Sequence, residues 1–201
     1  MFRALLIVGV LLAAPFAASA AEEAAGNEVR ITPDTLKVTV ETDDGPIEIL
    51  RNPDQEAVIE PGFAKTSRKC PPFCIQPMHA ADGVVTVGEL EVIDFLKNKA
   101  GILVDARTTD WHLKGTIPGS INVPYTEVTT PENLEKFGCK GTDCSGAQTL
   151  MLYCNGPWCG QSPNAIHALI KAGYPASKLL YYRGGVQSWK VLGLNMVEGS
   201  V

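Results

Sequence analysis

The stretch from residue 154 to residue 163 combines two cysteines with glycines in a pattern that could support thiol chemistry. It reads CNGPWCGQSP and directly follows a short apolar run at residues 149–153. Ser162 is a good helix N-cap and Pro163 a good first helical residue, so we expect a helix to begin there. Loop N–H groups and the positive end of that helix would then stabilise a Cys154 thiolate and make it nucleophilic.

The elements around this loop alternate between strand and helix patterns. Strands are expected at residues 84–86, 101–105, 149–153 and 178–182, and helices at residues 88–99, 131–137, 163–172 and 186–192. Short apolar runs that alternate with helices are typical of a parallel sheet covered on both faces. Sites in such sheets lie at the carboxyl ends of the strands, and Cys154 follows one of these ends.

Four signatures, in the right order, resemble the rhodanese domain. Residues 104–107 (VDAR) resemble its Asp-x-Arg signature, and residues 115–124 (GTIPGSINVP) its GHIPGAxNxP signature, with Thr116 where histidine is usual. Cys154 stands where the family places its catalytic cysteine, and residues 173–194 resemble the closing signature. The resemblance covers about residues 83–197. It implies an α/β fold with a five-stranded parallel sheet and helices on both faces.

The resemblance also implies a sulfurtransferase that carries a persulfide on Cys154. The thiolate would attack the outer sulfur of a small donor such as thiosulfate, and a thiol or another acceptor would then take that sulfur. No cofactor is needed for this exchange. The residues expected around the donor are Asn155, Gly156, Trp158, Gly160, Gln161 and Arg183.

The loop departs from the usual Cys-x4-Arg pattern of the family because Cys159 falls at the arginine position. No Arg or Lys lies between Cys154 and Ser162, so an anionic donor lacks its usual cation. Arg183 could approach from the next strand, or it could be a surface charge. Arg107 is expected to be structural, paired with Asp105 or capping a turn.

Cys159 opens two further alternatives. Its thiol could attack a persulfide on Cys154, which would release sulfide and form a disulfide that a reductase must reset. A permanent disulfide between Cys154 and Cys159 would instead silence the domain. His112 and His167 show no partner at ligand spacing, so His112 is expected in a loop and His167 on an exposed helix face.

The other four cysteines form two close pairs. Cys139 and Cys144 bracket a Gly/Asp turn, which favours a local disulfide. A disulfide is also the favoured interpretation of Cys70 and Cys74, with a resolving thiol for Cys154 as an alternative. A weaker alternative is a Cu(I) site, whose soft ligands would be Cys70, Cys74, Met78 and His79.

The first 20 residues have the features of a secretory signal peptide: a basic residue, a short apolar run and an A-x-A cleavage site. The run is too short to span a membrane comfortably, so we expect no membrane anchor after cleavage. We therefore expect a periplasmic protein, in an oxidising compartment where disulfides persist. Residues 21–82 form an extension with a β-hairpin, turning at residues 43–46, and a Pro/Cys-rich segment.

Composition narrows the function classes. The chain has 45% hydrophobic and 19% charged residues, which is typical of a globular protein. Its 17 basic and 22 acidic residues give a net charge of −5, which argues against nucleic acid as a partner. Three hypotheses remain: a sulfurtransferase, a thiol–disulfide oxidoreductase that uses Cys154 and Cys159 with a periplasmic redox protein, and an inactive module that binds a protein partner.

Overall fold

The computed structural model describes residues 28–200, so the expected signal peptide lies outside the described residues. Within that part of the chain, no helix combines the length and the apolar character needed to cross a membrane.

A five-stranded sheet forms the centre of the protein. Its strands are β3 (Val85–Val87), β4 (Ile102–Asp105), β5 (Ile121–Asn122), β6 (Leu150–Tyr153) and β7 (Leu179–Tyr182). They lie in the order β3-β7-β6-β4-β5, and every pairing is parallel. The five-stranded parallel sheet is therefore confirmed, and β6, which leads to Cys154, is its central strand.

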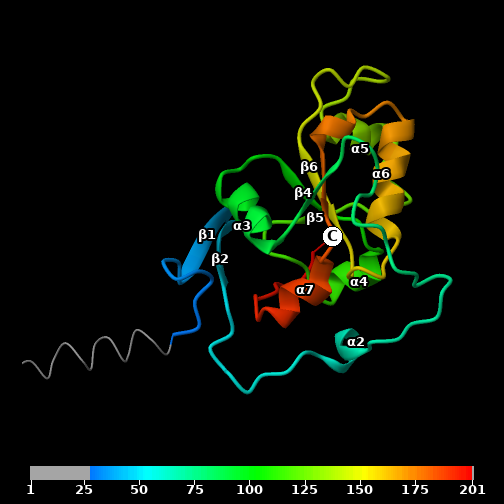
Figure 1. Ribbon diagram of the computed structural model, residues 1–201. Coiled ribbons are helices and arrows are strands. Elements are labelled where there is room, and N and C mark those ends of the chain that lie inside the picture. The colour runs from blue at the N-terminus through cyan, green and yellow to red at the C-terminus, as the bar shows by residue number, and fades with distance from the viewer. Residues whose placement is uncertain (1–27, 201) are drawn as a thin grey trace, which may run out of the picture.

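Helices cover both faces of this sheet, as expected (Figure 1). They are α3 (Glu89–Lys97), α4 (Thr109–Leu113), α5 (Pro131–Lys136), α6 (Gln161–Lys171) and α7 (Gly185–Val191), with a 3-10 turn at Ala176–Lys178. Leu150 and Leu152 of β6 pack in the cluster that contains α6, whereas Met151 and Tyr153 pack with α3 and α7. This alternation follows from the strand's period of two, and it buries β6 on both faces.

The extension begins with the expected hairpin, formed by antiparallel strands β1 (Lys37–Thr42) and β2 (Gly45–Leu50). Val40 and Ile49 are buried in the same cluster as α3. The hairpin is also fastened to the end of the chain, because the Leu50 N–H donates to Asn195 Oδ1 over 3.0 Å. The hairpin is thus part of the folded core and not an appendage.

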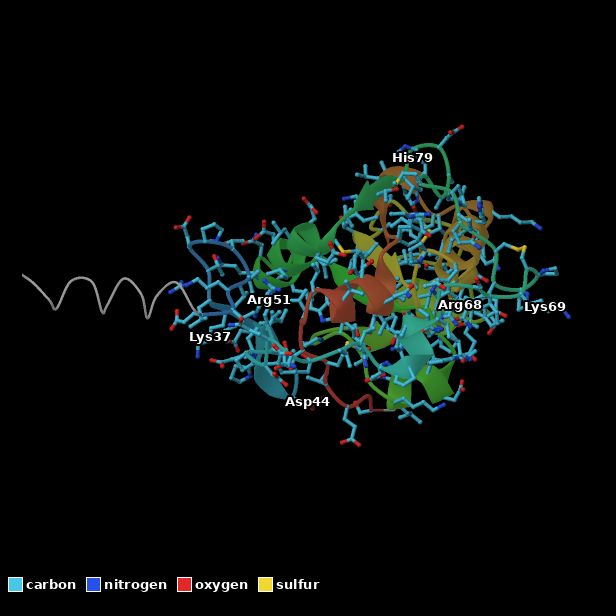
Figure 2. The ribbon with its side chains drawn as sticks, turned by 60° about the horizontal axis from the view of Figure 1, so that its bottom comes forward. Lys37, Asp44, Arg51, Arg68, Lys69 and His79 are labelled. Carbon is cyan, nitrogen blue, oxygen red and sulfur yellow. A yellow bond between two sulfur atoms is a disulfide. The ribbon has the colours of Figure 1, made fainter. Side chains whose placement is uncertain are left out.

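Residues 61–79, hereafter the strap, form the middle of the segment that connects the hairpin to β3. The strap begins with the short helix α2 (Pro61–Ala64) and is otherwise irregular, passing α7 and α4 before it returns to the sheet (Figure 1). Cys70 and Cys74 form a disulfide within it, as the sequence favoured. Figure 2 shows this stretch at the edge of the molecule, with Lys69 at the rim and Arg68 over the body of the domain.

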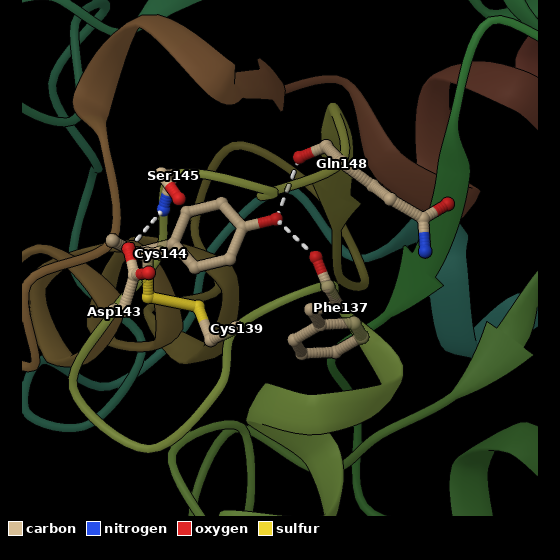
Figure 3. Close-up of a disulfide and its surroundings, with 7 residues drawn as sticks. Phe137, Cys139, Asp143, Cys144, Ser145 and Gln148 are labelled. Carbon is tan, nitrogen blue, oxygen red and sulfur yellow. Dashed lines mark hydrogen bonds between the residues drawn. A yellow bond between two sulfur atoms is a disulfide. The ribbon is translucent and has the colours of Figure 1, made fainter.

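The second disulfide, Cys139–Cys144, is also as favoured, and it closes a turn between α5 and β6 (Figure 3). Beside it, the Tyr174 hydroxyl donates to the carbonyl groups of Phe137, over 3.1 Å, and Gln148, over 2.6 Å. This region lies at the amino end of β6, so the disulfide supports the sheet at the end opposite Cys154.

Candidate active site

Cys154 follows β6 directly, at the carboxyl edge of the sheet. The strand register aligns Tyr153 with Asp105 on one side and Tyr182 on the other, so the ends of β4 and β7 flank the site. Cys154 is 2% exposed and Cys159 is 4% exposed, and both are free thiols. The permanent Cys154–Cys159 disulfide considered from the sequence is therefore not formed in this structure.

The first turn of α7 holds the start of the Cys154 loop. The N–H of Val186 donates to the Cys154 carbonyl and that of Gln187 to the Asn155 carbonyl, each over 3.0 Å. Gly185 allows this approach, because a Cβ at its φ of +56° would lie 2.2 Å from the Cys154 carbonyl oxygen. Glycine at position 185 thus fixes where β6 delivers its cysteine.

The sulfur of Cys154 lies in an environment that favours the thiolate. Burial opposes ionisation, but hydrogen bonds from Cys159, from the Ser162 side chain and from the N–H groups of Ser162 and Gly156 outweigh it, and they lower the pKa of Cys154 to about 7. The Ser162 hydroxyl donates to Cys154 Sγ over 3.2 Å. A thiol with this pKa is about half ionised at neutral pH, so a nucleophilic thiolate is present.

The start of α6 differs from the sequence expectation, and the difference explains the role of Ser162. The helix begins at Gln161 with Gly160 as its N-cap, so Ser162 is not the N-cap and Pro163 is not the first helical residue. Ser162 is fully buried in the first turn. Its hydroxyl reaches Cys154 from there, so the side chain expected to cap a helix instead serves the thiol.

Cys159 behaves differently from Cys154. Its hydrogen bond to Cys154, together with burial, raises the pKa of the Cys159 thiol far above its usual value. The Cys159 thiol donates to Gln161 Oε1 over 3.6 Å. The backbone carbonyl of Cys159 accepts a hydrogen bond from the Cys154 thiol over 3.1 Å. The two cysteines are therefore chemically distinct, with Cys154 the one that ionises.

A buried ion pair lies behind the loop. Arg107 donates to both carboxylate oxygens of Asp105, over 2.8 and 2.6 Å, which confirms the expected pairing. Burial opposes ionisation of Asp105, but hydrogen bonds from Arg107 and His112 outweigh it and lower the pKa of Asp105 to about 2. Arg107 also donates to Asn155 Oδ1 over 3.3 Å. The side chain of Asn155 thus links the buried Asp105–Arg107 ion pair to the Cys154 loop.

His112 is a residue that the sequence analysis placed wrongly. It lies on α4, not in a loop, and it is buried, with Nδ1 3.0 Å from Asp105 Oδ2. Thr116 donates to the same oxygen over 2.9 Å and lies 2.7 Å from the Tyr153 hydroxyl. The Asp105 carboxylate is therefore bonded to a guanidinium, an imidazole and a hydroxyl group. The signal available in the sequence was the short spacing of His112 and Thr116 from Asp105.

The strap lies against the outer side of the loop. The N–H of Gln76 donates to the Pro157 carbonyl over 2.8 Å, and the Phe73 ring meets the Trp158 ring edge-on at 5.5 Å between centroids. Trp158 is half-buried, and its indole N–H donates to Gln187 Oε1 over 2.7 Å. Gly160 and Gln161, which were also expected around the donor, are the N-cap and the first residue of α6. Sequence reasoning did not find the strap as part of the site.

Arg183 does not point into the loop as a free cation. Its guanidinium donates to the Gln76 carbonyl over 2.9 Å and to the Pro77 carbonyl over 3.2 Å. Arg183 thus holds the strap through two of its nitrogens, and its expected contact with a donor stays a prediction. The Cys70–Cys74 disulfide likewise leaves no thiolates for the copper alternative with Met78 and His79. Across residues 28–200, no cluster of three or more His, Cys, Asp or Glu could hold a metal ion.

Comparison with known proteins identifies a rhodanese-like domain over residues 90–192. A curated relative, the HTH-type transcriptional regulator Rv0324 of Mycobacterium tuberculosis, is 29% identical over 98 residues, which are 49% of this chain and 38% of that protein. The chain thus matches well under half the length of that relative.

Solved structures with a similar chain path include two described as sulfurtransferases. The human single-domain sulfurtransferase TSTD1 has a TM-score of 0.40 and 19% identity, covering 53% of this chain and 95% of that one. The thiosulfate sulfurtransferase from Pseudomonas aeruginosa has a TM-score of 0.45 and 23% identity, covering 59% of this chain and 21% of that one. Since the rhodanese-like match spans half of the sequence and includes the Cys154 loop, the chain belongs to the rhodanese-like domain family.

Proposed function

We propose that the protein is a sulfurtransferase that carries sulfane sulfur as a persulfide on Cys154. The observation that carries the proposal is the asymmetry of the two thiols: Ser162 and loop N–H groups stabilise the Cys154 thiolate, whereas Cys159 stays protonated. A single ionised, hydrogen-bonded thiol at a strand end suits nucleophilic attack on sulfur.

The reaction has two displacement steps. The Cys154 thiolate attacks the outer sulfur of a donor such as thiosulfate, the sulfur–sulfur bond of the donor breaks, and sulfite leaves with the electron pair. An acceptor thiolate then attacks the outer sulfur of the persulfide, which restores the Cys154 thiolate and yields the acceptor persulfide. Charge and atoms balance in each step, and no cofactor takes part.

The Ser162 hydroxyl and the N–H groups of Gly156 and Ser162 have the same task in both steps. Each step begins or ends with negative charge on sulfur near Cys154, and donors that are already oriented stabilise that charge without reorganisation. The bond from Arg107 to Asn155 and the bonds from α7 to the loop keep these donors in place.

The experiment is mass spectrometry of the protein after exposure to thiosulfate or polysulfide. We expect an adduct of one sulfur atom on Cys154, lost again when a thiol acceptor is added. Cys154→Ser should abolish the adduct, and Cys159→Ser should retain it. An adduct that persists in Cys154→Ser would move the nucleophile to Cys159 and contradict the proposal.

A thiol–disulfide oxidoreductase is the second candidate, favoured by the two free thiols of one loop, in which Cys154 Sγ lies 3.1 Å from the Cys159 carbonyl oxygen. A Cys154–Cys159 disulfide that cycles with a reductant, without any sulfur adduct, would support it. No reaction of either thiol would favour an inactive module that binds a protein partner.

A periplasmic location forms part of the proposal. It is supported by the signal-peptide features of residues 1–20 and by the Cys70–Cys74 and Cys139–Cys144 disulfides, which persist in oxidising compartments. The test is the mature N-terminus, determined by mass spectrometry after cell fractionation. A periplasmic protein that begins at Ala21 would support the location, and a cytoplasmic protein that begins at Met1 would contradict it.

A further inference from the structure

The Cys154 loop contains no cation of its own, although sulfur donors such as thiosulfate are anions. Two arginines of the folded domain have other partners near the loop. Arg107 is 1% exposed and neutralised by Asp105. Arg183 donates to carbonyl groups of the strap. The strap, which Arg183 holds, is a further source of positive charge at this loop.

The strap brings one cation onto the loop. The Arg68 guanidinium carbon lies 3.6 Å from the centroid of the Trp158 ring, close enough for a strong cation–π contact. Trp158 in turn lies beside the start of the loop, because a Cβ on Gly156 would be 3.0 Å from its indole nitrogen. Arg68 is thus stacked on a side chain that belongs to the loop itself.

The hydrogen-bonding capacity of Arg68 is largely unused. One terminal nitrogen donates to the Gly62 carbonyl over 2.9 Å, whereas Nε is buried and has no partner among residues 28–200. In the same part of the chain, no carboxylate lies within ion-pair distance of Arg68. A guanidinium stacked by its face keeps its N–H edge available for the oxygens of an anion.

We propose that Arg68 is a specificity-determining residue that supplies from the strap the positive charge missing from the Cys154 loop, and that it selects anionic sulfur donors. This inference rests on the proposed sulfurtransferase function. The Gln76–Pro157 hydrogen bond, the Phe73–Trp158 contact and the grip of Arg183 on the strap keep the strap on the loop. The extension thereby contributes a part of the active site that the rhodanese-like segment lacks.

Lys69 provides a matched control. It is the next residue in the chain and carries the same charge, but it is exposed, and Figure 2 shows it at the rim, away from the domain body. If only the net charge of the strap mattered, Arg68→Gln and Lys69→Gln would have equal effects. If the stacked position of Arg68 matters, only Arg68→Gln will change the selection of anions.

The experiment compares two alkylating reagents of nearly equal size, iodoacetate, which is an anion, and iodoacetamide, which is neutral. Rates of Cys154 alkylation are measured with both disulfides intact in the wild type, Arg68→Gln and Lys69→Gln. We expect Arg68→Gln to lower the iodoacetate-to-iodoacetamide rate ratio by about tenfold, the loss typical of one charge-assisted hydrogen bond. Lys69→Gln should leave the ratio within about twofold of wild type, as for an exposed charge.

The rate of sulfur loading from thiosulfate should fall in parallel in Arg68→Gln, and its dependence on salt should weaken. Equal changes with both alkylating reagents would overturn the proposal, because Arg68 would then only hold the strap. An unchanged ratio would overturn it as well. The proposed function fails separately, if wild-type Cys154 takes up no sulfur from thiosulfate or polysulfide, since the alkylation ratio reports on Arg68 without any sulfur transfer.

Discussion

The Ser162 hydroxyl donates a hydrogen bond to the sulfur of Cys154 over 3.2 Å, from the first turn of the helix that follows the loop. The bond crosses from the end of β6 to the start of α6, so one side chain links the strand that delivers the thiol to the helix whose N-terminus faces it. The arrangement favours the thiolate over the thiol, because a hydrogen bond from a hydroxyl to a charged sulfur is stronger than one to a neutral sulfur.

The first prediction concerns the ionisation of Cys154. The rate of its alkylation by iodoacetamide should rise with pH with a midpoint near the pKa of about 7. Ser162→Ala removes a donor to the thiolate, so the midpoint should move up by about one pH unit. Ser145→Ala, in an exposed turn near the Cys139–Cys144 disulfide, serves as the control and should leave the midpoint in place. A midpoint that does not move in Ser162→Ala would exclude Ser162 as the stabilising group.

A second prediction concerns Gly185. Gly185→Ala forces a Cβ to 2.2 Å from the Cys154 carbonyl oxygen, so the loop or α7 must shift. We expect a loss of stability of about 2 kcal/mol or more and a slower reaction of Cys154. Gly141→Ala has a similar φ of +62° with no atom within 4 Å, and should cost only the backbone strain, about 1 kcal/mol. Chemical denaturation and alkylation rates measure both effects, and equal losses in the two variants would show that crowding at Cys154 is unimportant.

The third prediction concerns the buried carboxylate. Because the folded-state pKa of Asp105 is about 2, below its unfolded value, its contribution is fully present above about pH 4 and is lost as the pH falls toward 2. Asp105→Asn leaves Arg107 buried without its counter-charge and should lower the free energy of unfolding by about 3–5 kcal/mol at neutral pH. Its stability should also fall less steeply between pH 4 and pH 2 than that of the wild type.

Asp110→Asn is the control for this measurement, because Asp110 is exposed and its partners, such as Thr108, are close neighbours in the sequence. Its stability should remain close to that of the wild type. Denaturation curves that are equal for Asp105→Asn and Asp110→Asn would mean that the Asp105–Arg107 pair does not support the fold.

The fourth prediction concerns the strap disulfide. Replacing Cys70 and Cys74 together by serine frees a loop that includes Phe73, which contacts Trp158. We expect the strap to detach more readily. If the free energy that holds the strap on the loop falls by about 1.4 kcal/mol, Cys154 should react with iodoacetamide on the order of tenfold faster. Replacing Cys139 and Cys144 instead should lower stability without accelerating Cys154. If only the loss of Cys139–Cys144 accelerated the alkylation of Cys154, the strap disulfide would not control access to this thiol.

Much of the sheet could be predicted from the sequence because buried strands such as β6 are short apolar runs bounded by turn residues. The two-residue strand β5 has no periodicity to detect, and α4 is barely longer than one turn. The start of α6 was misplaced by two residues because Ser162 and Pro163 suit a cap, while the buried hydroxyl is used by Cys154 instead.

The cysteine and its loop were evident from local spacing, but the groups around them were not. The contacts of Trp158 with Phe73 and Arg68 join segments that lie 85 and 90 positions apart in the sequence. No local pattern encodes such contacts. His112 was missed although it lies only seven residues from Asp105, because its burial depends on a carboxylate that belongs to another element.

The hairpin has a consequence for how this domain could be moved between proteins. Val38, Val40 and Ile49 are buried against the α3 side of the sheet, and β2 is bonded to the last residues of the domain. A fragment that began at residue 83 would lack the hairpin and would expose the apolar side chains of α3 that the hairpin covers. Such an exposed apolar patch favours self-association. The smallest fragment expected to fold on its own therefore starts near Lys37, and it adds three strands (β1, β2 and β3) and the strap to the homologous segment.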